Sequence, residues 1–375
     1  TSVPDGDRGK FTAFDTAGTT GRNQLQQLAD AGLTHVHVLP AFDFATVKED
    51  PASRVELNDP VEDLCAANPD AASLCTTDAG KTILQAMEDA VAANQLDRPQ
   101  QISEWLRDLD GFNWGYDPLH YGVPEGSYST DPNGAARILE FRRMVKGLNE
   151  LGLRTVLDVV YNHTNASGQN VRATLDRLVP GYYHRRDVNG GTVLKNSCCD
   201  DTAPEFRMME KLVTDTGVIW ARDYKITGFR FDLMSMHPLD GILRFRDAVQ
   251  AVDSSVHIYG EGWNCCGVED DKRFVAARQA NLGGTGIGSF SDRIRDPVRG
   301  GGPFDSGTAY VTNQGFINGW YYDPNAQNSG STEEREALIA DTDNIRTWLA
   351  GGLAGYRFVD ATGTEVSGSD VDYRG

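Results

Sequence analysis

Short, nearly continuous apolar runs alternate with amphipathic segments along this chain, and this alternation limits the folds that it can adopt. The runs lie at residues 33–40, 153–160, 226–233 and 255–263. Strands that are apolar on both faces occur in parallel sheets, where crossover helices cover both sides. The pattern predicts an α/β fold, either an open doubly wound sheet or a closed (β/α)8 barrel.

Amphipathic helices are predicted between these strands. Three of them lie at 21–31, 205–223 and 242–252, and a fourth is predicted to begin at Asp131, an N-cap that precedes a proline. A further short strand is predicted at 286–290. Strands and helices that alternate in this order are typical of parallel α/β domains.

The segment at about 43–110 interrupts the alternation and is predicted to be an irregular insertion with one helical piece at about residues 83–91, because it lacks the periodicity of a second large core. Two of the six cysteines, Cys65 and Cys75, lie in it, and no cysteine pair has the CxxC spacing of a zinc site. Either Cys65 and Cys75 form a disulfide, which would indicate an oxidising compartment, or all six cysteines are free thiols.

The charge of the chain excludes several function classes. Lys and Arg number 35 against 54 Asp and Glu, which gives a net charge of −19. Such a surface repels nucleic acids and anionic membranes and favours a neutral ligand. No apolar run approaches the roughly 18 residues of a transmembrane helix. No glycine-rich nucleotide-binding loop follows the first predicted strand.

Polar side chains are concentrated at the ends of three predicted strands, which form the active face of parallel α/β proteins. A single strand-end aspartate is often only a helix N-cap, but several polar residues in register on separate strands indicate a site. The predicted site consists of Asp158, Asn162, His163, Arg230, Asp232, Glu261 and Trp263.

The third run, 226–233, alternates between apolar and charged residues. Its apolar residues, Phe229, Phe231 and Leu233, are expected to face the helices, and Arg230 and Asp232 are expected to face the interior of a barrel. The arginine would keep Asp232 ionised, because a neighbouring cation favours a carboxylate.

A second acid, Glu261, follows Tyr259 and Gly260 and precedes Trp263. Aromatic walls and a nearby carboxylate are expected to raise its pKa and keep it protonated. One ionised and one protonated carboxyl group are what glycoside cleavage needs.

Aromatic residues support a sugar ligand, because the C–H faces of sugars pack against aromatic rings. The segment 111–130 contains Phe112, Trp114 and Tyr116. At least one of Phe112 and Trp114 is expected to be a core residue. Tyr116, in a turn before Pro118, is the better candidate for a ligand contact.

Four motifs resemble a known family in the right order. "DVVYNH" (158–163), "GFRFDLMSMH" (228–237) and "YGEGW" (259–263) are similar to regions of the α-amylase superfamily, glycoside hydrolase family 13. "FNWGYDP" (112–118) resembles the signature of its debranching branch, the type I pullulanases and limit dextrinases. The resemblance implies a (β/α)8 TIM barrel. It also implies hydrolysis, with retention, of α-1,6-glucosidic linkages in pullulan, amylopectin or limit dextrins.

The resemblance also implies a role for each site residue and leaves the site without a metal or cofactor. Relatives sometimes bind calcium, but no calcium site is identified in this sequence. By position, Asp232 would be the nucleophile, Glu261 the general acid/base and Arg230 the group that orients Asp232.

The other site residues would contact the sugar. His163 would form a hydrogen bond with the sugar at the cleaved linkage and Tyr116 would stack on its ring. Asp158 and Asn162 would support this side of the site, and Trp263 would border the sugar on the leaving side.

The chain departs from the family pattern in two ways. Ser235 stands where the family has glycine, and the His-Asp pair that supplies a third acid after the seventh strand is missing. We therefore expect residues 1–375 to be a partial barrel domain without its last strands and flanking domains, and nearly inactive alone. The cysteines favour an extracellular or periplasmic protein, with a plastid protein as the alternative.

Three other interpretations remain at this stage. His35 and His37 resemble the first-strand metal ligands of amidohydrolases, although the lysine and further histidines of that class are missing from later strands. The chain could also be an inactive glucan-binding fragment, or a related α-glucan hydrolase or transglycosylase of the same superfamily.

Overall fold

The computed structural model describes residues 2–370, which divide into two compact units. The first unit comprises residues 2–261 and 265–277, and the second comprises 262–264 and 278–370. Among the described residues, no helix combines the length and the apolar character that crossing a membrane requires.

A parallel sheet forms the centre of the first unit. Its strands β1 (His35–Val38), β4 (Arg154–Val159), β7 (Gly228–Phe231) and β8 (His257–Gly260) are neighbours in this order. Each strand falls within one of the predicted apolar runs, and all three pairings are parallel. The prediction of an α/β fold with a parallel sheet is confirmed.

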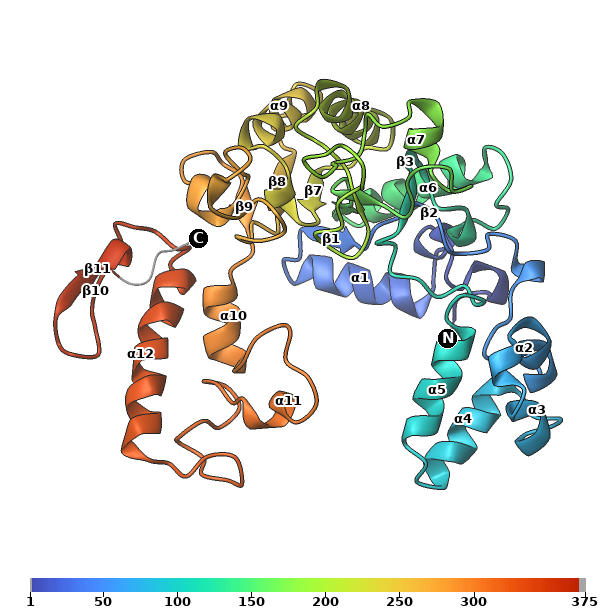
Figure 1. The fold of residues 1–375 in the computed structure, drawn as a ribbon, viewed down its shortest axis with the longest axis horizontal. Helices are drawn as coiled ribbons and strands as arrows, with labels where there is room; N and C mark the ends of the chain where they lie inside the picture. Colours follow the sequence, from blue (N-terminus) through green and yellow to red (C-terminus); the bar gives the residue numbers. More distant parts are fainter. Residues whose placement is uncertain (1, 371–375) are drawn as a thin grey trace. The chain divides into compact units, whose positions relative to one another are not determined.

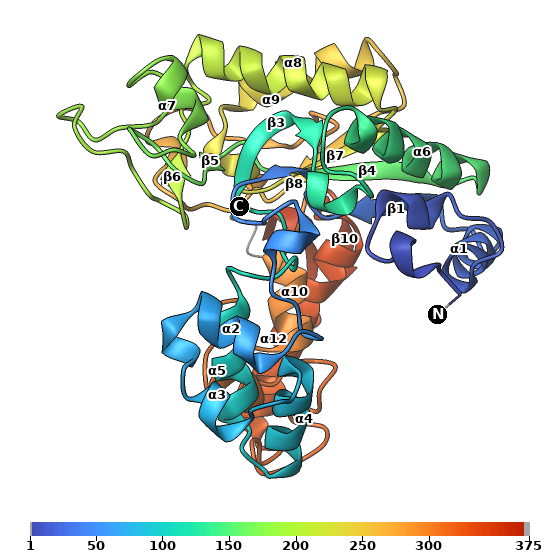
Figure 2. The same cartoon turned by 90° about the vertical axis from the view of Figure 1, so that its right-hand side faces the viewer.

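The predicted helices cover this sheet. They are α1 (Thr20–Asp30), α8 (Arg207–Asp223) and α9 (Leu239–Gln250). The last two lie side by side on one face of the sheet (Figures 1 and 2). Within this layer Phe229 and Phe231 of β7 pack edge-on against Phe245 of α9, at ring-centroid distances of 5.2 and 4.9 Å. These apolar residues of β7 therefore face the helices, as predicted.

Helix α6 (Ala136–Glu150) begins later than the sequence pattern predicts. The predicted N-cap, Asp131, instead accepts a hydrogen bond from the backbone N–H of Asn133 at 2.9 Å. This contact closes a local turn, and Gly134 adopts a left-handed φ of 60° before the helix starts. The predicted start at Asp131 is wrong because the aspartate caps a turn instead of the helix.

The segment interpreted as an irregular insertion is largely helical. Its helices are α2 (Val61–Ala67), α3 (Leu74–Thr77), α4 (Ile83–Ala92) and α5 (Asp97–Leu106). They share a small apolar core of their own. The helical piece that the sequence predicts at about residues 83–91 is confirmed as α4. Helices α2 and α3 are too short to show a sustained period, and the pattern does not indicate them or α5. The fully buried members of this core are Val61, Leu64, Ala71, Leu74, Ile83 and Ile102.

Two antiparallel ribbons complete the surroundings of the sheet. Strand β2 (Phe42–Phe44) pairs with β3 (Pro118–Pro124), and β5 (His163–Thr164) pairs with β6 (Asp200–Asp201). A short helix, α7 (Thr174–Leu178), lies between β5 and β6 in the sequence. The second ribbon joins the segment after β4 to the segment that carries Cys198 and Cys199.

The second unit contains three helices and two short strands that form a hairpin, and it includes the strand that the sequence predicts at 286–290. Its elements are β9 (Gly288–Ser289), α10 (Asp292–Arg299), α11 (Ala309–Thr312), α12 (Thr332–Leu349), β10 (Arg357–Val359) and β11 (Glu365–Ser367). Helix α12 begins with a capping box, in which Ser331 and Glu334 each accept a backbone hydrogen bond from the other.

Candidate active site

The register of the parallel sheet places three polar residues side by side. Asp158 of β4 is paired with Arg230 of β7, and Arg230 is paired with Tyr259 of β8. Asp232 and Glu261 follow directly after β7 and β8. The carboxyl ends of these strands therefore carry the predicted acids on one edge of the sheet, as the strand pattern implies.

The guanidinium of Arg230 joins three carboxylates. Its Nη1 lies 2.9 Å from Asp158 Oδ1 and 3.1 Å from Asp232 Oδ1, and its Nη2 lies 2.6 Å from Glu261 Oε1. The side chain of Arg230 is 9% exposed. Burial opposes its charge, but the attraction of the three acids outweighs burial and raises the pKa of Arg230. The side chains of Asp232 and Glu261 therefore both contact one guanidinium, that of Arg230.

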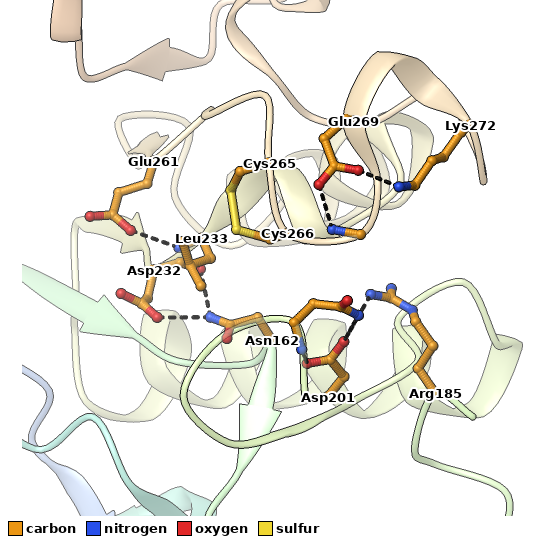
Figure 3. The surroundings of a disulfide bond; sticks show 12 residues. Asn162, Arg185, Asp201, Asp232, Leu233, Glu261, Cys265, Cys266, Glu269 and Lys272 are labelled. Carbon is orange, nitrogen blue, oxygen red and sulfur yellow. Dashed lines mark hydrogen bonds and ion pairs between the residues drawn. A yellow bond between two sulfur atoms is a disulfide. The ribbon is translucent and has the colours of Figure 1, made fainter. Parts of the chain in front are cut away.

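Asp232 is held from a second side by Asn162 (Figure 3). Asn162 Nδ2 donates to the Asp232 backbone carbonyl at 2.8 Å and to Asp232 Oδ2 at 2.9 Å. The backbone N–H of Asp232 donates to the carbonyl of Val159 at 3.0 Å. Both carboxylate oxygens of Asp232 therefore have partners, one on Arg230 and one on Asn162.

Glu261 receives a backbone hydrogen bond from Leu233, 3.0 Å long (Figure 3). Leu233 has a left-handed backbone, with φ of 39° and ψ of 52°, and is half-buried. The predicted strand runs to Leu233, but β7 ends at Phe231 and Leu233 lies in the turn that follows it. A strained residue in this position aims its N–H at the candidate acid.

The environment of Glu261 favours its protonated form. Burial raises its pKa above the ordinary value, the charge of Asp232 raises it further, and Arg230 opposes both effects. The net direction is upward, as the sequence analysis expects. A carboxyl group that keeps its proton near an ionised neighbour can act as a general acid.

Tyr116 and His163 form the next part of the site. Tyr116 Oη donates to Asp158 Oδ2 at 2.7 Å, and its ring lies 5.9 Å from the guanidinium carbon of Arg230. His163 Nε2 lies 2.8 Å from the backbone carbonyl of Tyr116, and its Nδ1 lies 2.5 Å from Asn162 Oδ1. The structure therefore brings together all the predicted site residues of the first unit.

Trp263 is the one predicted site residue outside the first unit. It belongs to the second unit, where it is half-buried. The guanidinium carbon of Arg295 lies 5.4 Å from the centre of its ring. This distance is typical of a cation–π contact, which orients the ring within its own unit.

Phe112 and Trp114 do not belong to the core. Their exposed fractions are 73% and 63%. The expectation that at least one of them is buried is wrong, because Gly115 turns the chain between Trp114 and Tyr116 and only Tyr116 points to the sheet. Gly115 has φ of 87°, which favours glycine.

All six cysteines are paired in the structure, so the free-thiol alternative is wrong. Cys65 and Cys75 form the disulfide that the sequence analysis considered. The other four form two disulfides between adjacent residues, one at 198–199 and one at 265–266. Sequence reasoning missed both, although the two "CC" dipeptides were the available signal.

Both adjacent disulfides belong to loops near the site. Cys198 Sγ lies 3.9 Å from His163 Nε2. Cys265 and Cys266 lie on the segment that follows Glu261 (Figure 3). A Cβ on Gly267 would lie 2.7 Å from the amide carbon of Asn196. The loop that carries Cys265 and Cys266 therefore packs closely against the loop that carries Cys198 and Cys199.

The structure gives no support to the amidohydrolase alternative, which requires metal ligands on β1. Among residues 2–370, neither of the two groups of side chains that could share an ion contains His35 or His37. His37 instead bonds Tyr259 Oη through its Nδ1 at 3.0 Å, and its Nε2 lies 3.8 Å from Asp158 Oδ2. The two groups are His163 with Cys198 and Cys199, and Asp43 with Glu49 and Glu125.

The chain is similar to pullulanases along its whole length. The Pullulanase Ins domain family matches residues 44–112. A pullulanase of Klebsiella aerogenes is 42% identical over 100% of this chain and 34% of its own length. Pullulanase 1 of Arabidopsis thaliana, a chloroplastic protein, is 40% identical over 99% of this chain and 36% of its own.

Solved structures give the same result. The crystal structure of Klebsiella pneumoniae pullulanase complexed with maltotriose is 40% identical and has a TM-score of 0.91, covering 99% of this chain and 36% of that one. This chain therefore spans about a third of the length of the relatives that it matches. The resemblance that the four sequence motifs indicate is confirmed.

Proposed function

We propose that this chain forms part of the (β/α)8 catalytic barrel of a debranching glycoside hydrolase. The proposal follows from its similarity to pullulanases along its whole length. Its substrates would be α-1,6-glucosidic linkages in pullulan, amylopectin or limit dextrins. Relatives named pullulanases and a relative complexed with maltotriose support an α-glucan as the ligand.

One observation carries this proposal. A single buried guanidinium, that of Arg230, binds the carboxylates of Asp232 and Glu261 through its two terminal nitrogens. Two carboxyl groups that converge on one point, one of them with a raised pKa, are the minimal equipment for glycoside cleavage.

In the first step of the proposed reaction, Asp232 attacks the anomeric carbon. The bond from this carbon to the glycosidic oxygen breaks, and Glu261 gives its proton to that oxygen. In the second step, Glu261 takes a proton from water, the water oxygen bonds to the anomeric carbon and the bond to Asp232 breaks. Two displacements at one carbon retain its configuration.

The remaining residues bind and orient in this proposal. Arg230 and Asn162 fix the two oxygens of Asp232, so that little reorganisation precedes attack. Tyr116 would stack on the sugar whose linkage is cleaved and His163 would bond it, while Trp263 would border the leaving side. The reaction needs no cofactor, since the two carboxyl groups supply the acid, the base and the nucleophile.

Substitutions in the complete protein test the two roles separately. Glu261→Gln should lower kcat on pullulan by about 10²- to 10⁴-fold. Its first step should stay fast on maltotriosyl fluoride, because fluoride leaves without a proton. Asp232→Asn should be slow on both substrates. If Glu261→Gln slowed the first step equally on both substrates, its role as the acid would be contradicted.

Two further points belong to the proposal. The 375 residues contain no His-Asp dipeptide, so residues 1–375 alone are proposed to hydrolyse pullulan very slowly, which a reducing-sugar assay measures. The three disulfides fit an extracellular or periplasmic protein. The chloroplastic relative supports the plastid as the alternative.

A further inference from the structure

The segment 110–117 presents two large aromatic rings to solvent beside the candidate active site. Phe112 is 73% exposed and Trp114 is 63% exposed. Neither ring packs on another aromatic ring among residues 2–370. Rings of this size dominate binding energetics when they are covered, so two neighbouring uncovered rings indicate a binding surface.

The backbone that carries these rings is held in place by side-chain hydrogen bonds. Asn113, which lies between them, donates from Nδ2 to Thr46 Oγ1 at 2.8 Å and accepts at Oδ1 from the N–H of Gly115 at 2.6 Å. Its carbonyl accepts from Tyr128 Oη at 3.3 Å. The rings therefore project from a fixed loop, which lowers the entropy that binding would cost.

Gly115 connects this loop to the site. A Cβ at this position would lie 2.5 Å from the carbonyl oxygen of Pro40 and 2.5 Å from Phe44 Cε1, so only glycine fits. With φ of 87°, it sends Trp114 outward while Tyr116 reaches Asp158. The exposed rings and the ring that contacts the site thus belong to one continuous segment.

We propose that Phe112 and Trp114 form a stacking platform for glucose units of an α-glucan beyond the cleaved linkage. This inference rests on the proposed function. A neutral sugar chain suits the position, because its C–H faces pack on aromatic rings and a chain with a net charge of −19 repels an anionic ligand. Continuity with Tyr116 favours a ligand that already occupies the active site over an unrelated partner.

The first test compares a polymer with a short substrate in the complete protein. Trp114→Ala should lower kcat/KM on amylopectin by roughly 2- to 10-fold more than on a short branched oligosaccharide, mainly through KM. Phe112→Ala should lower kcat/KM on amylopectin in the same way but to a smaller degree. Trp114→Phe, which keeps an aromatic ring, should retain most of the wild-type kcat/KM on amylopectin. Leu96→Ala, which removes an equally exposed apolar side chain between α4 and α5, is the matched control.

The second test separates this inference from the proposed reaction. Retardation of the Asp232→Asn protein in a pullulan-containing gel measures binding without catalysis, and adding Trp114→Ala should reduce it. Equal retardation of both proteins, or equal losses on polymer and short substrate, would overturn the platform. Loss of a dimer in Trp114→Ala without a change in glucan binding would also overturn it. If the wild-type protein did not hydrolyse pullulan but was still retarded in the gel, and Trp114→Ala reduced that retardation, only the proposed reaction would be overturned.

Discussion

The backbone N–H of Leu233 donates a hydrogen bond to the side chain of Glu261 at 3.0 Å, and it does so from a left-handed conformation with φ of 39°. Leucine pays a steric penalty there of about 1–3 kcal/mol. The residue directly follows Asp232, so a single turn holds the proposed nucleophile on one side and the proposed acid on the other. Strain at this point is consistent with a catalytic constraint.

Leu233→Val should disrupt this turn more than Leu233→Gly. A β-branched residue rarely adopts positive φ, whereas glycine adopts it freely and keeps the N–H. We expect Leu233→Val to lower kcat/KM on pullulan by about tenfold, which corresponds to about 1.4 kcal/mol, while Leu233→Gly stays within a few-fold of wild type. Steady-state kinetics and circular dichroism check both variants. Equal activity of the two would show that the backbone conformation is irrelevant to the reaction.

Arg230→Lys should be severe although it keeps the charge. A lysine ammonium lacks the planar fork that reaches Asp232 and Glu261 from two nitrogens at once. Removing a partner from a buried ion pair costs about 3–5 kcal/mol, so we expect a lower melting temperature and a loss of kcat. Calorimetry and pullulan hydrolysis measure the two effects. Arg244→Lys, at an exposed ion-pair site on α9, is the control and should change neither.

The pKa of Glu261 should fall when Asp232 loses its charge, because repulsion from Asp232 is one of the causes that raise it. NMR titration of labelled carboxyl carbons in wild type and Asp232→Asn measures this change. In wild-type protein, the alkaline limb of kcat/KM should report loss of the Glu261 proton. An unchanged titration in Asp232→Asn would mean that the two carboxylates do not interact.

The same pKa makes a prediction about stability. Its folded value is raised, so the stability that protonated Glu261 contributes is fully present below the unfolded pKa and is lost as pH rises through the folded pKa. Glu261→Gln is neutral at every pH and should not show this loss. Denaturant unfolding of both proteins from acidic to neutral pH should therefore show their difference in stability shifting in favour of the variant. Parallel curves would contradict the raised pKa.

The sheet and most of the site could be predicted because buried parallel strands leave continuous apolar runs and their polar ends stand out. Asp158, Arg230 and Glu261 interrupt three such runs, and the register brings them together. The turn at Leu233 left no signal, since one residue's φ does not change an apolar pattern. The exposure of Trp114 was hidden for a similar reason, because it depends on how Gly115 packs against Pro40 and Phe44.

Helices α2, α3 and α5 of the insertion and the two pairs of adjacent cysteines were not predicted, whereas α4 and the Cys65–Cys75 pair were among the expectations. Four short helices that share one small core show little periodicity, and the start of α6 depended on a turn that Asp131 caps. Disulfide pairing depends on which thiols come close together in the fold and on the redox compartment. The spacing of the cysteines along the sequence determines neither of these.

The three disulfides should differ in what they contribute to stability. Cys75 lies 10 positions after Cys65 in the sequence, whereas each of the other pairs joins neighbours and closes almost no loop. In the chain-entropy account, a loop of this size contributes about 2–3 kcal/mol. The Cys65→Ala/Cys75→Ala variant should therefore expose the helices of residues 44–112 to limited proteolysis. Cys265→Ala/Cys266→Ala should leave that segment protected, and faster cleavage there in the second variant would contradict the loop-closure explanation.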